Sequence, residues 1–288
     1  MSRIAILTPD PADQSYARDW PVILKRVSDA LSATGAEVTP EPWTAHVEDG
    51  AGLAGYDLVL PLVVWGYHRD HARWMQACAS WAAAGVAIAN PARVLSWNSD
   101  KAYLRELADA GIAIPPTVFA DRVDAAAVDE ALARFGAPVI AKPTVSGGAW
   151  KTLKLTASDD LSAAPDGAAM IQPYLSAIED GELSLLYFGG RLSHAVLKRP
   201  AAGDFRIQTQ FGGDHVFVAE PPAEAVALAG AALAAVPEPL LYARVDMVRD
   251  PALGWLLMEL ELIEPDFYLV HDPAAGAGFA RAVSERLA

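Results

Sequence analysis

The chain contains little cysteine and few basic side chains, and each shortage excludes some classes of function. Its 288 residues include one cysteine, Cys78, which excludes a disulfide framework and any metal site built on several thiolates. The 22 Lys and Arg residues are outnumbered by 36 Asp and Glu, giving a formal charge of −14. Such a surface repels nucleic-acid phosphates and anionic membranes, so neither is expected as a partner. Basic residues at a functional site should therefore each face a specific anion.

Long apolar runs are also missing. Hydrophobic residues make up 53% of the chain, yet no run reaches the ~18–20 residues that a membrane-spanning helix requires. The opening stretch MSRIAILTPD begins directly on a strand-like run and lacks the apolar region and cleavage site of a secretory signal. A single cysteine suits a reducing compartment, because it cannot form an intrachain disulfide. Together with the missing secretory signal, it leads us to expect a cytoplasmic protein.

The first ninety residues alternate strand-like and helix-like segments. We expect strands at 3–8, 37–40, 57–63 and 86–91, and helices at 21–34 and 72–84. This alternation predicts a parallel sheet with helices on its faces, and ligands then bind beyond the carboxyl ends of the strands. Candidates for substrate recognition at that rim are Thr8, Asp10, Trp65, Tyr67 and His68. Packing explains the aromatic residues equally well, and a lone loop histidine is more often only solvated.

The remaining two thirds of the chain change pattern and become rich in strands. A helix is expected at 99–110, with Asn98 or Ser99 as its N-cap, and another at 223–235. Strands are expected at 136–143, 152–155, 170–175, 184–188 and 192–198. The Ala/Asp-rich stretches 121–129 and 158–166 are interpreted as surface segments of a small middle domain.

The most informative segment is an acidic hairpin at 241–269. Two apolar strands flank a turn at 250–254, and alternate strand positions share a face, so Arg244 lies beside Asp246 and Glu259 beside Glu261. The other face is expected to carry Val245, Leu257, Leu260 and Leu262. Three carboxylates at an apolar surface repel one another unless a cation lies among them, and hard oxygen ligands suit Mg²⁺. The alternative is a solvated face of an edge hairpin.

Three weaker motifs precede the hairpin. Lys142 ends an apolar strand and is followed by Ser146-Gly147-Gly148, a loop whose backbone N–H groups suit phosphates; a Gly-Gly hairpin beside a surface lysine is the alternative. The acidic loop 172–182 suits an adenine edge and ribose hydroxyls, or forms an interdomain hinge. Lys198, Arg206 and Gln208 suit a substrate carboxylate or a phosphoryl group, or belong to a solvated loop.

Taken in order, these motifs resemble the ATP-grasp superfamily of carboxylate ligases. The resemblance covers residues 98–269 and rests on a helix-initial Lys101, "GIxxPPT", the strand-KP-glycine loop, "QPYL…GE", "RVD" and "ELE…P". It is strongest to the glutathione synthetase and ribosomal-protein glutamate ligase branch and to the O-ureido-serine cyclo-ligases that form cycloserine. The implied fold is α/β: an N-terminal parallel domain (1–97), then a lid subdomain (98–172) and a C-terminal subdomain (173–288), both α+β, sandwiching ATP.

The resemblance also implies roles for individual residues. Lys101 and Lys142 match the phosphate-contacting lysines, Ser146, Gly147 and Gly148 the mobile loop, and Glu182 the ribose-binding acid. Gln172, Tyr174 and Leu175 match the adenine hinge. Asp246, Glu259 and Glu261 match ligands of two magnesium ions, and Arg244 and Arg206 match the active-site arginines. Glu261 stands where the family commonly has Asn, and Lys198 and Gln208 replace an arginine and an asparagine, which makes glutathione synthesis itself doubtful.

The implied reaction converts a small-molecule carboxylate into an acyl phosphate, which a nitrogen nucleophile then attacks. The expected partners are a carboxylate and an amine, and a homodimer is compatible with the family. Joining two molecules and closing a ring within one remain equally open. Two other classes remain: a non-catalytic ATP-binding module and a kinase that phosphorylates a small molecule and stops. The module would be expected to lose a metal carboxylate or the arginine, and neither is lost here.

Overall fold

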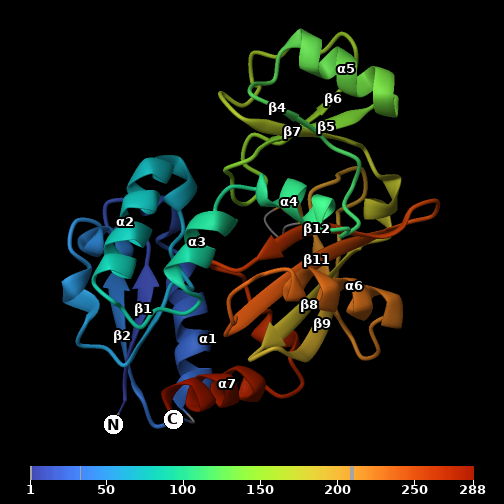
Figure 1. The fold of residues 1–288 in the computed structure, drawn as a ribbon. Coiled ribbons are helices and arrows are strands. Elements are labelled where there is room, and N and C mark those ends of the chain that lie inside the picture. Colours follow the sequence, from blue (N-terminus) through green and yellow to red (C-terminus); the bar gives the residue numbers. More distant parts are fainter. Residues whose placement is uncertain (1, 33, 208–210) are drawn as a thin grey trace.

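The N-terminal sheet is parallel, as the alternation of elements predicts. The computed structural model describes residues 2–32, 34–207 and 211–288. Strand β1 (Arg3–Thr8) lies between β2 (Glu37–Pro42) and β3 (Leu58–Leu60), and both neighbours run parallel to it. Residues 4–8 are buried, as expected for a strand covered on both faces. Helices α1 (Trp20–Ser32) and α2 (His71–Ala83) belong to this unit, and the C-terminal α7 (Ala277–Leu287) packs against α1 (Figure 1).

Two sequence-based expectations in this region are wrong. Residues 86–91 do not form a fourth strand: only an isolated bridge joins Val59 to Ile88, and the chain then turns away toward Pro91. The helix expected at 99–110 is shortened to α4 (Tyr103–Asp109), and a separate short helix that was not expected, α3 (Ala92–Asn98), precedes it. Asn98 does not cap a helix, because its buried side chain bonds to a distant strand instead. Lys101 consequently lies in the link between the two helices.

The middle of the chain forms a four-stranded antiparallel sheet with one covering helix. Its strands are β4 (Val118–Ala120), β7 (Ala169–Pro173), β5 (Val139–Pro143) and β6 (Leu153–Leu155), in that spatial order. Helix α5 (Ala125–Phe135) was not expected, because its Ala/Asp-rich start was interpreted as a surface segment. Asp124 caps this helix by accepting a hydrogen bond from the Ala127 N–H. Within the helix, the side chains of Val128 and Ala131 are buried.

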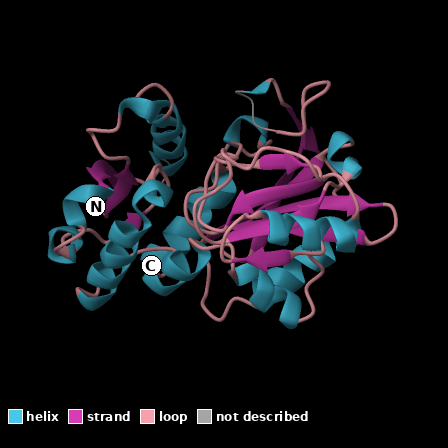
Figure 2. Ribbon diagram, turned by 90° about the horizontal axis from the view of Figure 1, so that it is seen from above, coloured by secondary structure: helices cyan, strands magenta, loops and turns pink. Residues whose placement is uncertain are grey.

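The C-terminal part forms a five-stranded antiparallel sheet. Its spatial order is β10 (Asp214–Val218), β9 (Arg191–Arg199), β8 (Glu182–Phe188), β11 (Tyr242–Asp250) and β12 (Gly254–Glu261), with helix α6 (Ala223–Ala234) packed on it. The predicted acidic hairpin is confirmed as β11 and β12. Figure 2 shows this sheet beside the N-terminal unit. In the described part of the chain, no helix is long and apolar enough to cross a membrane.

Strand β12 is an edge of its sheet, and its outer backbone groups are covered by side chains from residues 98–103. The Asn98 amide donates to the Leu260 carbonyl at 2.7 Å and accepts from the Leu262 N–H at 2.9 Å. The Tyr103 hydroxyl accepts from the Leu260 N–H at 2.8 Å. Buried backbone groups must be satisfied somewhere, so these contacts replace the missing neighbouring strand. They fix the acidic hairpin against the segment that carries Lys101.

Replacing Asn98 with alanine should destabilise the protein by about 1–3 kcal/mol, because the buried Leu262 N–H loses its acceptor and the Leu260 carbonyl keeps only the Tyr103 hydroxyl as donor. Thermal unfolding followed by circular dichroism measures the change. Ser96→Ala is a matched control, because that exposed hydroxyl bonds only within its own helix turn. Equal melting temperatures for Asn98→Ala and wild type would contradict the covering role.

Candidate active site

The register of β11 and β12 puts four charged residues on one face of the sheet. Arg244 is paired with Glu261 and Asp246 with Glu259, and directly opposed residues point to the same side. A bulge lets Met247 pair with Leu257 and leaves Met258 as the extra residue. The bulge brings Leu257 onto the apolar face with Val245 and Leu260, where all three are buried in one cluster. The face expected from the sequence is therefore present.

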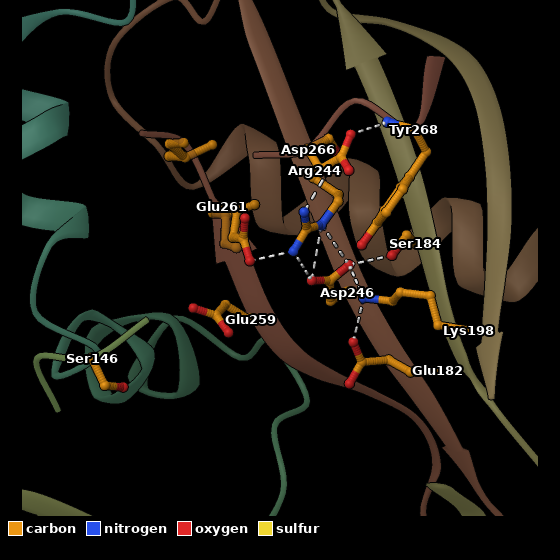
Figure 3. Close-up of polar contacts among 12 residues, drawn as sticks. Ser146, Glu182, Ser184, Lys198, Arg244, Asp246, Glu259, Glu261, Asp266 and Tyr268 are labelled. Carbon is orange, nitrogen blue, oxygen red and sulfur yellow. Dashed lines mark hydrogen bonds and ion pairs between the residues drawn. The ribbon is translucent and has the colours of Figure 1, made fainter. Parts of the chain in front are cut away.

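Cationic side chains lie among these carboxylates (Figure 3). Arg244 contacts both Asp246, at 2.9 Å, and Glu261. Lys198 Nζ lies 3.1 Å from Asp246 and 2.6 Å from Glu182, and Ser184 donates a hydrogen bond to Asp246. Burial alone would raise the pKa of Asp246, but Arg244 and Lys198 outweigh it, so the pKa is lowered and the carboxyl stays ionised. The repulsion foreseen from the sequence is thus relieved by the protein itself.

Lys198 and Arg206, which the sequence grouped in one loop, are separated. Lys198 lies in β9 and is almost fully buried between Glu182 and Asp246, so the alternative of a solvated loop is wrong for it. Arg206 pairs with Asp204 at 2.7 Å in its own loop and lies 3.8 Å from the Phe211 ring centroid. Within the described residues, no hydrogen bond or ion pair joins Arg206 to the acidic hairpin. Gln208 lies outside the described residues.

Lys101 connects the acidic hairpin to the glycine loop. Its Nζ lies 3.0 Å from Glu259 and donates to the Ser146 carbonyl at 2.8 Å, while its backbone N–H donates to Thr144. Lys142, at the end of β5, makes no ion pair with any described residue, although Glu259 and Glu182 are close enough to act on its pKa. Burial is the main reason that the pKa of Lys142 is lowered. An incompletely neutralised cation in such a place favours a bound anion.

The donor set suits a hard divalent cation, although the carboxylates contact protein cations here. No group of three or more His, Cys, Asp or Glu side chains in the described ranges is positioned to hold a metal ion. Glu259 and Glu261 retain exposed fractions of 31% and 26%, whereas Asp246 is enclosed by Arg244, Lys198 and Ser184. Carboxylate oxygens are the hard ligands that Mg²⁺ prefers, so the chemistry of the donor set, though not its arrangement in this structure, fits the ion.

The predicted adenine hinge follows β7. The Gln172 amide donates to the Thr117 hydroxyl at 2.9 Å, and the Tyr174 hydroxyl donates to Glu179. Leu175 packs in a small apolar cluster with Ala177, Val248, Leu256 and Met258. This cluster continues the charged face of the hairpin, because Val248 follows Asp246 at i+2 and the bulged Met258 precedes Glu259. Glu182 begins the next strand and is buried against Lys198.

The N-terminal rim divides into packed and site-facing residues. Thr8 is buried at the end of β1, and Tyr67 is buried against Trp74 at a ring separation of 4.8 Å. Asp10 lies 3.6 Å from Arg73 at the surface. His68 contacts the glycine loop: a Cβ at Gly147 would lie 3.2 Å from His68 Nδ1. Burial, helped by Arg69 and Lys101, lowers the pKa of His68 to about 4, so its ring is neutral near pH 7.

Three side chains around the charged face were not assigned from the sequence. Ser184 lies within the strand expected at 184–188 but was given no role, yet its hydroxyl donates a hydrogen bond to Asp246. Tyr268 places its ring 5.3 Å from the Arg244 guanidinium and has a left-handed backbone, with φ of 48°. Glu264 lies three positions beyond Glu261 in the segment "ELIEP". This closeness in sequence to the hairpin carboxylates was the one sign in the sequence that it belongs near the site.

Sequence comparison connects this geometry to known ligases. A family model described as the N-terminal domain of D-cycloserine synthetase DcsG matches residues 4–90. The cycloserine biosynthesis protein DcsG of Streptomyces lavendulae is 31% identical over 224 residues, which cover 69% of this chain and 73% of that protein. A glutathione synthetase of Prochlorococcus marinus is 30% identical over 213 residues, covering 67% of this chain and 64% of its own length.

Solved structures agree on the fold. The crystal structure of D-cycloserine synthetase DcsG superimposes with a TM-score of 0.82 at 24% identity, covering the whole of both chains. D-alanine–D-alanine ligase from Bacillus anthracis gives a TM-score of 0.71 at 18% identity, over all of this chain and 96% of that one. The expected α/β ATP-grasp architecture is confirmed. The chain belongs to the ATP-grasp superfamily of carboxylate–amine ligases, enzymes that use ATP and typically magnesium, and it is related to the cycloserine-forming DcsG.

Proposed function

We propose that this ligase activates the carboxylate of a small, amino-acid-derived molecule and that a nitrogen of the same molecule closes a ring. The γ-phosphoryl group of ATP passes to a carboxylate oxygen, which gives an acyl phosphate and ADP. The nitrogen then attacks the acyl carbon, the C–O bond to phosphate breaks, and the nitrogen loses a proton. Ring closure is favoured over joining two molecules because the N-terminal unit, residues 4–90, matches the model of a cycloserine synthetase domain.

One observation carries this proposal: the hairpin register opposes Arg244 to Glu261 and Asp246 to Glu259, next to two lysines. Lys101 and Lys142 would contact the phosphates, and the backbone of Ser146, Gly147 and Gly148 would close over them. Arg244 would stabilise charge on the transferred group, since catalysis of phosphoryl transfer is mainly positioning and charge neutralisation. Arg206 is not needed in these roles, because it is engaged by Asp204 in the structure.

Asp246, Glu259 and Glu261 would hold two magnesium ions, which neutralise the charge of the triphosphate. Glu259 and Glu261 contact Lys101 and Arg244 in this structure, and with magnesium bound to these carboxylates both cations would be available to the phosphates. Glu261 adds a negative charge where the family commonly has Asn, which favours tighter metal binding. Adenine would lie against Leu175, Val248, Leu256 and Met258, with Gln172 and Tyr174 on the hinge and Glu182 at the ribose. The proposed units are residues 1–97, 98–172 and 173–288, with ATP between the last two.

Trapping with hydroxylamine tests this function. With ATP, Mg²⁺ and a panel of amino acids that includes O-ureidoserine, we expect ADP formation that depends on the carboxylate and a hydroxamate when hydroxylamine is added. Without hydroxylamine, mass spectrometry should find a product lighter than the substrate by one water. A phosphate ester with no hydroxamate would establish a kinase instead, and a product containing two substrate molecules would contradict ring closure.

A further inference from the structure

The glycine loop and the residues beside it, 144–150, are held from one side by Lys101. Its Nζ donates to the Ser146 carbonyl at 2.8 Å, and its backbone N–H donates to the Thr144 carbonyl at 2.8 Å. The same Nζ lies 3.0 Å from Glu259, so a single side chain separates the loop from the acidic hairpin. Lys101 is buried at this place. The position of the loop therefore decides how much water reaches the charged face.

A second contact with the loop comes from the N-terminal unit. The centroids of the His68 and Trp150 rings are 5.7 Å apart, and a Cβ at Gly147 would lie 3.2 Å from His68 Nδ1. Within the described ranges, residues 2–90 share no hydrogen bond, ion pair or apolar core cluster with residues 112–172. The packing of His68 on Gly147 and Trp150 therefore joins these two parts of the chain.

His68 offers the loop a fixed support. It lies in the short 3-10 turn Tyr67–Asp70, and the residues on both sides of it are held in place. Tyr67 is buried against Trp74, and Arg69 pairs with Asp13 at 2.9 Å. The backbone of His68 is thus fixed by contacts within the N-terminal unit, independently of the loop.

Trp150 lies in a strained part of its loop. Its neighbours Ala149 and Lys151 have φ of 61° and 51°, a left-handed conformation that costs free energy for residues other than glycine. Such strain persists only where surrounding contacts hold it, and it is concentrated at functional sites. Lys151 Nζ lies 5.1 Å from the Trp150 ring centroid and 2.8 Å from Asp166. Trp150 remains 40% exposed, so its contact with His68, rather than burial, accounts for its placement.

We infer that Trp150 is a positioning residue: packed on His68, it holds residues 144–150 over the charged face until the nitrogen attacks the acyl phosphate. This inference rests on the proposed function. Water that reached the acyl phosphate would attack the acyl carbon, break the C–O bond to phosphate and return the free carboxylate. ATP would then be consumed without product, so the loop has to exclude water during this interval.

Tryptic cleavage after Lys151 measures the position of the loop without any turnover, because cleavage follows the population of the open form. We expect His68→Ala and Trp150→Ala each to speed this cleavage by about 10-fold, the size of a lost aromatic contact. The double variant should go no further, since both changes remove the same contact. Trp150→Phe keeps a ring and should stay close to wild type. Phe217→Ala, at a similarly exposed aromatic residue on the edge strand β10, is the control.

The second readout is the amount of ADP released per molecule of ring product, with O-ureidoserine, ATP and Mg²⁺. Wild type and Trp150→Phe should release about one ADP per product, and Trp150→Ala about 10-fold more, because water then intercepts the acyl phosphate. A variant that had merely lost structure would lose ADP release and product together.

The remaining outcomes separate the inference from the proposed function. Unchanged cleavage in His68→Ala, additive effects in the double variant, or an unchanged ratio of ADP to product in Trp150→Ala each overturn the inference and leave the ligase function standing. A wild-type enzyme that forms ADP but no hydroxamate with any carboxylate overturns the proposed function, and the shielding role of Trp150 falls with it.

Discussion

Glu259→Gln is expected to lower kcat by about two to three orders of magnitude while leaving the folded structure intact. Glu259 lies opposite Asp246 on the charged face and is the carboxylate that Lys101 contacts. Removing its charge weakens the binding of the divalent cation that the proposed mechanism places against the triphosphate. Stability should change little, because Lys101 keeps its hydrogen bond to the Ser146 carbonyl and the Glu259 side chain is 31% exposed.

The measurement is ADP release at saturating ATP, repeated over a range of Mg²⁺ concentrations, together with thermal unfolding. Raising Mg²⁺ should recover part of the activity, because the loss is one of metal affinity. Glu285→Gln is a matched control: it makes the same change of charge in an exposed ion pair with Arg191, on the C-terminal helix α7. Wild-type turnover in Glu259→Gln at low Mg²⁺ would refute a metal-binding role for this residue.

The parts of the site that lie close together in the sequence were predictable from it. Strand alternation alone placed Arg244 with Asp246 and Glu259 with Glu261, and the short turn at 250–254 brought the pairs together. Leu257 is instructive, because simple alternation puts it on the same face as Glu259. Only the bulge at Met258 brings it to the apolar face, and nothing in the local sequence marks a bulge.

Contacts between distant elements were not predictable. Lys198 and Arg206 are eight residues apart, but one is fixed inside β9 by Glu182 and Asp246 and the other by Asp204 in a loop. The pairing of β9 with β8 decides this, because it sets Lys198 opposite Glu182. Asparagine is a common N-cap residue, so Asn98 was expected to cap a helix. In the structure its amide is buried against the edge of β12 and bonds to the Leu260 carbonyl and the Leu262 N–H instead. Such assignments depend on tertiary packing, which overrides local preference.

Lys198→Met should destabilise the protein by about 3–5 kcal/mol, the cost of leaving a buried carboxylate uncompensated. Methionine retains the apolar stem of lysine but removes the ammonium that lies between Glu182 and Asp246. Burial alone would lower the pKa of Lys198. The two carboxylates raise it instead, because their negative charges stabilise the protonated ammonium. Asp246 keeps Arg244 and Ser184, so Glu182 loses most. The melting temperature should fall by an amount on the order of 10 °C.

A second substitution distinguishes a lost ion pair from lost packing. In Lys198→Met/Glu182→Leu no unpaired carboxylate remains at Glu182, and buried ion pairs replaced by apolar residues often cost little stability. The double variant should therefore be more stable than Lys198→Met alone, whereas additive losses would mean that packing carried the effect. Lys25→Met, which removes an exposed pair with Asp29, should leave the melting temperature nearly unchanged. The double variant should still lose ligase activity, because Glu182 is the proposed ribose-binding acid, and recovered stability without activity would separate the two roles of this network.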